Sequence, residues 1–429
     1  MFYKETDNDG LGKKLPSGWK DAKLGKLVED MFYGITAKAV PKETGLRMLR
    51  TTDITNYEIN WKTLPFCEIT DSRNDVKRYL LRKNDLIVAR AGTTGVSVLV
   101  DRDSSDTIFG SYLIKLALKP ELNPKFAHYF FQSNLYWEHI ERNKAGSTLK
   151  NIKLPILNSL PMALPSMKEQ LEIAKVLSTV DDAIQKSNEI VAKSERLRKG
   201  LMQDLLAKGI GHRKFKRCEL GQIPEEWSTV ELDKVVHFQN GRFFPSEDYS
   251  ADGIKLLRPG NLHPDGFLSW NAQNTQYLPL EYASKASEWI VRGREIVMNL
   301  TAQSLEDEFL GRVCLTEDDE YCLLNQRLAR ITSHNIDVAF LFLILRSQLF
   351  RKYVDRLPGG TKIKHIYTRD LGRFVLPLPS LDEQKRIDAI IFDIAKAKSE
   401  EEQTLAVLAT VKSGLMQLLL TGKVRVKVN

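Results

Sequence analysis

The most regular hydrophobic pattern in the chain lies in two long segments, residues 166–208 and 380–422. In both segments apolar side chains recur at intervals built from threes and fours, which is heptad spacing and predicts a helix with one apolar face. These positions are Ile173, Leu177, Val180, Ile184, Val191, Leu201 and Leu205, and then Ile387, Ile391, Ile394, Leu405, Leu408, Leu415 and Leu419. Polar residues interrupt both patterns near the middle, at Ser187 and Ser194 and at Lys398 and Glu401. An interrupted pattern predicts a packing surface other than a uniform two-stranded zipper.

Each long segment has clear start and stop signals. Ser166 and Ser380 follow a proline and precede a glutamate by three positions, which is the pattern of a capping box. Glycines at the far ends predict where the helices stop. Each predicted helix has 43 residues and a length of roughly 60–65 Å. A helix of that length needs a partner, so we expect the two to pack antiparallel on each other. The alternative is two unrelated helices, each docked on its own domain.

The long segments belong to an internal repeat. Leu-Pro-Ser-x-x-Glu-Gln at 164–170 returns at 378–384, and Gly-Leu-Met-Gln at 200–203 returns at 414–417. A Pro-x-x-Trp sequence precedes each insert, ending at Trp19 and Trp227. The repeat predicts two similar frames that hold two dissimilar inserts. Gly200 and Gly414 fall inside the helices at a cost of about 1 kcal/mol each. Either another backbone approaches closely there or the helix frays.

The inserts, residues 19–160 and 227–374, have the pattern of mixed structure dominated by short strands. Short β-rich runs occupy 85–90 and 295–299, and both follow a similar polar phrase. Each insert later contains the pattern of a short helix, at 124–141 and at 338–356, and the second of these is strongly apolar. Each ends in a basic, glycine-rich stretch, at 145–151 and 359–365.

The loops after the β-rich runs and the glycine-rich stretches carry most of the candidate binding residues. Polar side chains on a loop that follows a strand are suited to reach base edges, and a basic Gly/Ser/Thr loop is suited to bind phosphate. The loop at 90–95 lacks the Gly-Lys-Ser/Thr ending of a phosphate-binding P-loop. A solvated surface loop is the alternative for each stretch. The predicted DNA-binding residues are Arg90, Thr93, Thr94, Lys150 and Asn151 in the first insert, and Arg242, Arg258, Asn261, Asn299, Gln303, Lys362, Lys364 and His365 in the second.

Composition changes this picture only slightly. The net charge of +8 mildly favours a polyanionic partner. The basic segment 208–217 between the repeats fits a solvated hinge better than a DNA clamp. The four cysteines lack CxxC spacing, so we expect neither a zinc site nor a disulfide framework. This cysteine usage predicts that the protein is located in the reducing cytoplasm. We expect no membrane span and no signal peptide. Motifs of methyl-donor, nucleotide and metal-protease sites are missing, so we predict no catalytic residue and no metal site.

The repeated Leu-Pro-Ser-x-x-Glu-Gln, Gly-Leu-Met-Gln and Pro-x-x-Trp sequences, with two differing inserts between them, resemble the specificity subunit of type I restriction–modification enzymes. The resemblance covers essentially the whole chain. It implies an α+β fold: two mixed α/β target recognition domains separated by two long antiparallel helices, with a pseudo-two-fold internal repeat. The implied boundaries are 1–160 and 217–374 for the recognition domains, and 161–210 and 375–425 for the helices.

The resemblance also implies a function and partners. The chain would bind double-stranded DNA without catalysing a reaction, with each recognition domain reading one half of a bipartite, asymmetric site. Two methyltransferase subunits would dock on the helices, and restriction subunits would join for cleavage. S-adenosylmethionine, ATP and Mg²⁺ would be cofactors of those partners and not of this chain. The alternative is a coiled-coil scaffold that joins proteins and shows no salt-dependent DNA binding. A lone enzyme is disfavoured by the missing motifs.

Overall fold

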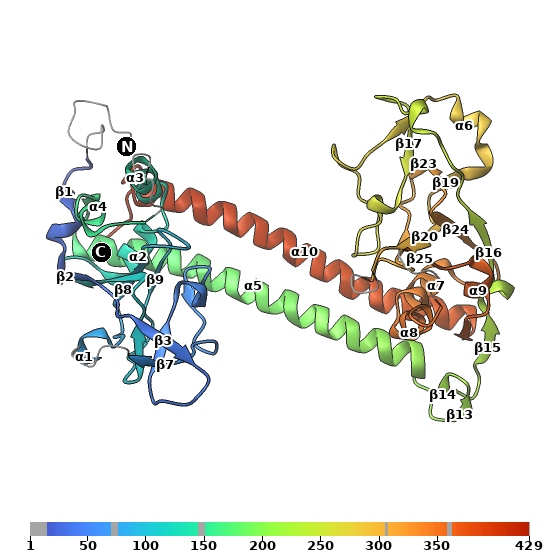
Figure 1. Cartoon of the computed structure of the whole chain (residues 1–429), viewed down its shortest axis with the longest axis horizontal. Helices are drawn as coiled ribbons and strands as arrows, with labels where there is room; N and C mark the ends of the chain where they lie inside the picture. Colours follow the sequence, from blue (N-terminus) through green and yellow to red (C-terminus); the bar gives the residue numbers. More distant parts are fainter. Residues whose placement is uncertain (1–14, 70–75, 145–150, 305–307, 358–362, 429) are drawn as a thin grey trace. The chain divides into compact units, whose positions relative to one another are not determined.

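A computed structural model describes residues 15–69, 76–144, 151–304, 308–357 and 363–428. The chain divides into two compact units (Figure 1): unit 1 comprises Met1–Glu189 and Glu402–Asn429, and unit 2 comprises Ile190–Glu401. This division passes through both long helices, α5 (Met167–Lys208) and α10 (Leu381–Leu419). The boundaries expected from the sequence follow the ends of the inserts instead, because the repeat motifs lie there.

Unit 1 is built on two four-stranded sheets. The first has the order β2-β11-β8-β9 and is antiparallel throughout. The second has the order β10-β4-β7-β3, with β10 and β4 parallel. Short pairs β1-β12 and β5-β6 complete the unit. The strands are β1 (Lys20–Lys23), β2 (Val28–Tyr33), β3 (Ala37–Val40), β4 (Arg47–Leu49), β5 (Ile54–Thr55), β6 (Glu58–Ile59), β7 (Phe66–Ile69), β8 (Leu86–Ala89), β9 (Ser97–Leu99), β10 (Thr107–Phe109), β11 (Leu113–Leu118) and β12 (Pro161–Leu164), and the short helices are α1 (Val76–Tyr79), α2 (Pro124–Phe130), α3 (Asn134–Lys144) and α4 (Leu154–Asn158).

Unit 2 repeats this architecture. Its antiparallel sheet is β16-β24-β20-β22, and its second sheet, β18-β17-β23-β19, again contains one parallel pair, β17 with β23. The pairs β15-β26, β13-β14 and β21-β25 are short. The elements are β13 (Phe215–Cys218), β14 (Gly221–Pro224), β15 (Ser228–Glu231), β16 (Val236–Asn240), β17 (Ile254–Leu257), β18 (Tyr277–Leu278), α6 (Tyr282–Lys285), β19 (Ile290–Arg292), β20 (Ile296–Asn299), β21 (Thr301–Ala302), β22 (Val313–Leu315), β23 (Tyr321–Leu324), β24 (Leu328–Ser333), α7 (Val338–Leu345), α8 (Gln348–Val354), β25 (Lys364–His365), α9 (Thr368–Gly372) and β26 (Val375–Leu378).

The helical patterns within the inserts break where the sequence predicts continuous helices. Each forms two short helices, α2 with α3 and α7 with α8. The break falls at Ser133 in unit 1 and at Ser347 in unit 2. Each serine hydroxyl donates to a carbonyl three residues earlier, at 2.6 and 2.7 Å. Ser347 also accepts from the Phe350 N–H, so it caps α8 as it ends α7.

The ends of the long helices are buried against the inserts. Ile173 and Leu177 of α5 lie in one apolar cluster with Phe126 and Phe130 of α2. In unit 2, Ile387 and Ile391 of α10 share a cluster with the side chains of α7. The apolar positions nearer the middle, such as Val191 and Leu405, are only half-buried. The apolar positions were expected to join the two helices. Those near the helix starts instead pack each long helix against its own insert.

The two helices are antiparallel, and each unit shows this by itself. In unit 1, Asp181 of α5 pairs with Lys412 of α10 at 2.7 Å, and Glu169 pairs with Arg425, which follows α10. In unit 2, Glu195 of α5 pairs with Lys398 of α10 at 3.3 Å, and the backbone N–H of Ile210 donates to Glu383 at 2.9 Å. In both units a later residue of the first helix meets an earlier residue of the second. The antiparallel prediction is confirmed.

The polar interruption of the heptads has a structural role. Lys398, which breaks the apolar pattern of α10, binds Glu195 of α5. The Arg198 guanidinium, with help from Lys398, lowers the pKa of Glu195 to about 2. Charged contacts therefore hold the helices together where the apolar positions are sparse. Among the described residues, no helix combines the length and apolar character needed to cross a membrane.

Candidate nucleic-acid interface

In unit 1 the structure joins two stretches that the sequence analysis singled out separately. The Ile152 N–H donates to the carbonyl of Arg90 at 2.9 Å, which places Asn151 beside the loop after β8. The Arg90 guanidinium lies over the ring of Tyr33, with 4.3 Å from Cζ to the ring centre. Arg90 Nε is buried without a hydrogen-bond partner in the described part of the chain. On the same loop Thr93 is exposed and Thr94 half-buried. Lys150 lies outside the described residues.

Unit 2 makes the same junction. The Ile366 N–H donates to the carbonyl of Leu300 at 3.0 Å, and β21 pairs with β25. This pairing brings exposed Gln303, which follows β21, close to half-buried Lys364 and His365. The ring of His365 packs against Tyr367, whose side chain is exposed. Lys362 lies outside the described residues.

Arg242 belongs to the same end of the sheet in unit 2. It follows β16, is exposed, and donates its backbone N–H to the carbonyl of Leu324 at 3.0 Å. Its guanidinium lies 5.1 Å from the ring centre of Trp289 and 5.7 Å from that of Phe244. Aromatic packing limits the rotamers of an arginine without neutralising it, which suits recognition of phosphate or guanine.

Three residues that were predicted to contact DNA, namely Arg258, Asn261 and Asn299, use their side chains in hydrogen bonds within the fold. The Asn261 side chain is fully buried; its Oδ1 accepts from the Arg258 N–H, and its Nδ2 donates to the carbonyls of Ser269 and Asn274. Arg258 is half-buried and donates to the Asn274 carbonyl at 3.0 Å. In unit 1 the matching turn is held by an ion pair, Arg50 with Asp53, at 2.9 Å. An acidic residue at this place in one repeat indicates a role in shaping the turn.

Asn299 is the other buried asparagine. It is fully buried at the end of β20, and its Nδ2 donates to the carbonyls of Thr301 at 2.7 Å and Phe309 at 3.0 Å. The side chain thus folds the loop that carries Gln303. A direct base contact by Asn261 or Asn299 does not fit these positions, because the amide groups are enclosed and used.

The structure brings one further exposed residue in each unit to this end of the sheet: Tyr112 in unit 1 and Arg327 in unit 2. The sequence analysis did not single out either residue. The Arg90 N–H donates to the Tyr112 carbonyl at 2.8 Å, and the Leu300 N–H donates to the Arg327 carbonyl at 3.0 Å. Both side chains are exposed. Each residue is the last of a three-residue connection before a strand. No periodicity marks such a position, so only the fold reveals it.

In unit 2 this end of the sheet carries the cations Arg242, Arg327 and Lys364, a residue type that suits phosphate and base edges. Within the described ranges no group of histidine, cysteine, aspartate and glutamate side chains could hold a metal ion. The four cysteines are free thiols.

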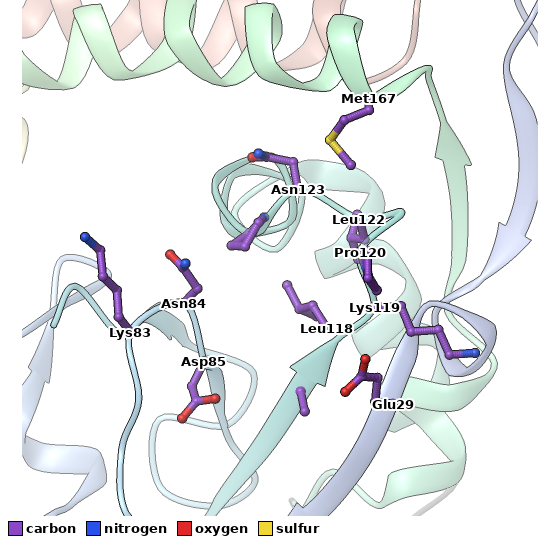
Figure 2. A pocket seen from close by; sticks show the side chains of 12 residues that line it. Glu29, Lys83, Asn84, Asp85, Leu118, Lys119, Pro120, Leu122, Asn123 and Met167 are labelled. Atoms are coloured by element: carbon purple, nitrogen blue, oxygen red, sulfur yellow. The ribbon is translucent and has the colours of Figure 1, made fainter. Parts of the chain in front are cut away.

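A hollow of about 380 Å³ opens elsewhere in unit 1 (Figure 2). Its lining runs from Lys83, Asn84 and Asp85 to the segment Leu118–Asn123, with Met167 at the start of α5 on its edge. Asp85 is engaged by the buried Lys115 at 2.5 Å, so its charge is already neutralised. Acidic, basic and apolar groups alternate around the hollow, and no ligand chemistry follows from them.

Comparison with known proteins agrees with this arrangement. The family described as "Type I restriction modification DNA specificity domain" matches residues 16–193 and again residues 224–409. The chain is 29% identical over 436 residues to the type I restriction enzyme MjaVIII specificity subunit of Methanocaldococcus jannaschii, covering all of this chain and 98% of the relative. It is 24% identical to the EcoBI specificity subunit of Escherichia coli over 362 residues, which cover 80% of this chain and 73% of that one.

Solved structures share the fold. The crystal structure of the type I restriction–modification S subunit from M. genitalium has a TM-score of 0.54 at 17% identity, covering 95% of this chain and 98% of that one. A chain from a study of complex assembly and conformational transition of the type I system has a TM-score of 0.61 at 16% identity, covering 96% of this chain and all of that one. Since the family matches both repeats and most of the length, the chain belongs to the type I restriction–modification DNA specificity family.

Proposed function

We propose that this chain is the non-catalytic DNA-recognition subunit of a type I restriction–modification enzyme, in which each unit reads one half of a bipartite, asymmetric DNA site. One observation carries the proposal. Each unit presents matching loops at the same end of its own antiparallel sheet, but with different side chains. Arg90 and Tyr112 of unit 1 correspond to Leu300 and Arg327 of unit 2. Equal frames with unequal side chains are suited to read two different sequences.

The proposal includes docking of two methyltransferase subunits on the long helices. Leu197 of α5 and Val411 of α10 are exposed apolar side chains, 54% and 43% accessible. Each precedes a helical glycine by three positions, so side chain and glycine share a face. A Cβ built at Gly200 or Gly414 meets no heavy atom within 4 Å. This leaves room at both glycines for the backbone of another subunit.

Catalysis then belongs to the partners. S-adenosylmethionine would be bound by the methyltransferase subunits, and ATP and Mg²⁺ would serve restriction subunits where these join. The cytoplasm, where host DNA is found, is the expected location. The purified chain should therefore bind DNA and neither methylate nor cut it. Either activity in a preparation free of partner subunits would overturn this part.

The decisive experiment is to map DNA methylation in the host with this gene intact and deleted. We expect one asymmetric, two-part motif to lose methylation on deletion and to regain it when the gene is restored. Unchanged methylation would contradict the proposal. The coiled-coil scaffold alternative predicts that result, together with the absence of salt-dependent DNA binding.

A further inference from the structure

The connection before β11 in unit 1 is held by its neighbours along its whole length. It consists of Gly110, Ser111 and Tyr112 and lies between β10 and β11. Backbone hydrogen bonds surround it: Gly110 N–H to Leu49 at 2.9 Å, Ile35 N–H to Phe109 at 3.1 Å, Gly34 N–H to Leu113 at 2.9 Å, and Arg90 N–H to Tyr112 at 2.8 Å. We call these three residues the reading turn of unit 1.

Unit 2 has the same turn with the same bonds. Asn325, Gln326 and Arg327 lie between β23 and β24 and form the reading turn of unit 2. The matching bonds are Asn325 N–H to Leu257 at 3.1 Å, Arg242 N–H to Leu324 at 3.0 Å, Gly241 N–H to Leu328 at 2.9 Å, and Leu300 N–H to Arg327 at 3.0 Å. The agreement of all four bonds makes Tyr112 and Arg327 structural equivalents.

In each unit a glycine directly after β2 or β16 lets the backbone there come unusually close to the turn. A Cβ at Gly34 would lie 2.2 Å from the carbonyl oxygen of Gly110, and a Cβ at Gly241 would lie 1.9 Å from that of Asn325. Any larger residue would push the turn away. The backbone position of each reading turn is therefore determined by the frame and not by its own side chains.

The side chain at the third position projects from this frame into solvent. Tyr112 is 64% accessible, and Arg327 is exposed. In the residues that the structure describes, the Arg327 guanidinium makes no hydrogen bond or ion pair. Its neighbours are the candidate DNA contacts: Leu300 leads into β21 and Gln303, and Arg242 bonds beside the turn. A fixed backbone that carries a free donor group lowers the entropy cost of a specific contact.

We propose that this third position is a base-reading position in both units. It rests on the proposed function, since it names residues that would read each half-site. Arg327 donates to O6 and N7 of a guanine in the major groove, the contact for which a guanidinium is best shaped. Tyr112 occupies the same place in unit 1, where its ring packs against the methyl group of a thymine. Neutralisation of a phosphate by this position in both half-sites would need a cation in both units, and tyrosine supplies none.

The test uses the full chain, expressed with its methyltransferase partner in a host from which the native gene is deleted, and methylated motifs are mapped by sequencing. Arg327→Ala should relax one guanine position in one half-site, lowering the preference there by about 10- to 100-fold. Arg327→Lys keeps the charge but loses the bidentate geometry and should relax the same position. The other half-site in the same motif must stay unchanged and serves as the internal control. The exposed Arg373, which follows α9, gives a matched control as Arg373→Ala.

The reciprocal change tests the equivalence of the two turns. Tyr112→Arg should create a new guanine preference at one position of the half-site read by unit 1, and Tyr112→Ala should relax that position. The idea fails if Arg327→Ala leaves the motif and its base preferences intact. It also fails if that variant weakens methylation equally at all sequences, which is the signature of a phosphate contact. If the wild-type chain directs no bipartite methylation at all, the proposed function fails instead, so the two failures are distinct.

Discussion

Trp227 and Glu383 are 156 positions apart in the chain, and the indole Nε1 of Trp227 donates a hydrogen bond of 2.9 Å to the Glu383 carboxylate. In unit 1, Trp19 donates to Glu169 at 3.1 Å. The tryptophan that precedes each insert and the glutamate that opens each long helix therefore meet in space. This bond also corrects the capping-box prediction. The serines do accept from the glutamate N–H groups, at 3.4 and 3.3 Å, but the carboxylates bind the tryptophans and do not reach back.

The same glutamates tie the two long helices together. Glu383, at the start of α10, also accepts from the Ile210 N–H and from His212, both at 2.9 Å, in the chain that leaves α5. Glu169, at the start of α5, binds Arg425, in the chain that leaves α10. The glutamine that follows each glutamate accepts from the N-cap N–H of α2 or α7, at 2.7 and 2.8 Å. The Glu-Gln pair thus connects an insert to both helices.

Glu383→Ala should destabilise unit 2 by about 2–3 kcal/mol. The substitution leaves the buried indole N–H of Trp227 and the Ile210 N–H without their acceptor, and buried donors without partners are costly. Urea unfolding followed by circular dichroism measures the loss. The exposed Glu225, two residues before Trp227, is the matched control as Glu225→Ala and should change the stability little. Equal stability of the two variants would contradict this role for Glu383.

Unit 1 should lose stability as the pH falls from about 6.5 toward 4. Burial, and next the nearby positive charge of Lys412, lower the pKa of His128 to about 4, with Lys125 adding to the effect and Asp181 opposing it. The unfolded chain binds a proton near pH 6.5 and the folded chain does not, so the folded state is favoured above pH 6.5 and this advantage disappears on acidification. The loss at pH 4 should reach at most about 3 kcal/mol.

The variant His128→Phe removes this titration. Phenylalanine stands at the corresponding place of the repeat, Phe342, so the helix accommodates it there. Hydrogen exchange of peptides from α2 should show a smaller increase in opening between pH 7 and pH 5 in the variant than in the wild type. The exposed His237 supplies the control, because His237→Phe should keep the wild-type pH dependence. Parallel pH profiles for wild type and His128→Phe would mean that His128 does not carry the effect.

Gly414→Ala should stabilise the free chain by about 0.5–1 kcal/mol. Alanine has the better helix propensity, and a Cβ at Gly414 meets no atom of this chain within 4 Å. Gly414→Trp should instead reduce capture of the methyltransferase subunit in a pull-down, because the large side chain blocks close approach. Ala409→Trp, on another face of α10, is the control for adding an exposed indole. Undiminished capture by Gly414→Trp would remove this glycine from the docking surface.

Lys364→Ala should weaken DNA binding at all sequences. If Lys364 neutralises one phosphate, its loss should lower the slope of log affinity against log salt by about 0.9. Fluorescence anisotropy over a salt series measures that slope. Lys352→Ala, an exposed lysine on α8, should leave it unchanged. An unaltered slope in Lys364→Ala would show that β25 is solvated surface.

Shortening both long helices by one heptad should shorten the DNA spacer. The pairs Asp181–Lys412 and Glu195–Lys398 set the register on either side of residues 187–193 and 400–406, so deletion of these segments keeps opposite partners in phase. Each helix loses about 10 Å, which is roughly three base pairs of B-DNA. Methylation should move to a motif with the same half-sites and a shorter spacer. A folded variant that methylates the original motif would show that the helices do not measure the spacing.

The sequence alone was sufficient to predict the two long helices and the internal repeat. The structure places α5 at Met167–Lys208, within one residue of the predicted start, and Gly209 adopts the positive φ of a helix-terminating glycine. The α10 helix ends three residues earlier than predicted, at Leu419. These features rest on residues three or four positions apart, so capping and heptad spacing encode them locally. For the same reason the sequence located the loops after β8 and β20, which local strand and turn patterns mark.

The tertiary structure decided which polar residues face solvent. Asn261 and Asn299 looked suited to base recognition, but their amides are consumed by carbonyls brought to them by the folding of the loops. Tyr112 and Arg327 carry no local signal and became visible only when segments far apart in the chain were seen to hold their turns. The partners of Glu169 and Glu383 were likewise unpredictable, because Trp19 and Trp227 lie about 150 positions away. Burial and hydrogen-bond partners depend on contacts between distant segments, whereas helix caps and periodicity depend on near neighbours.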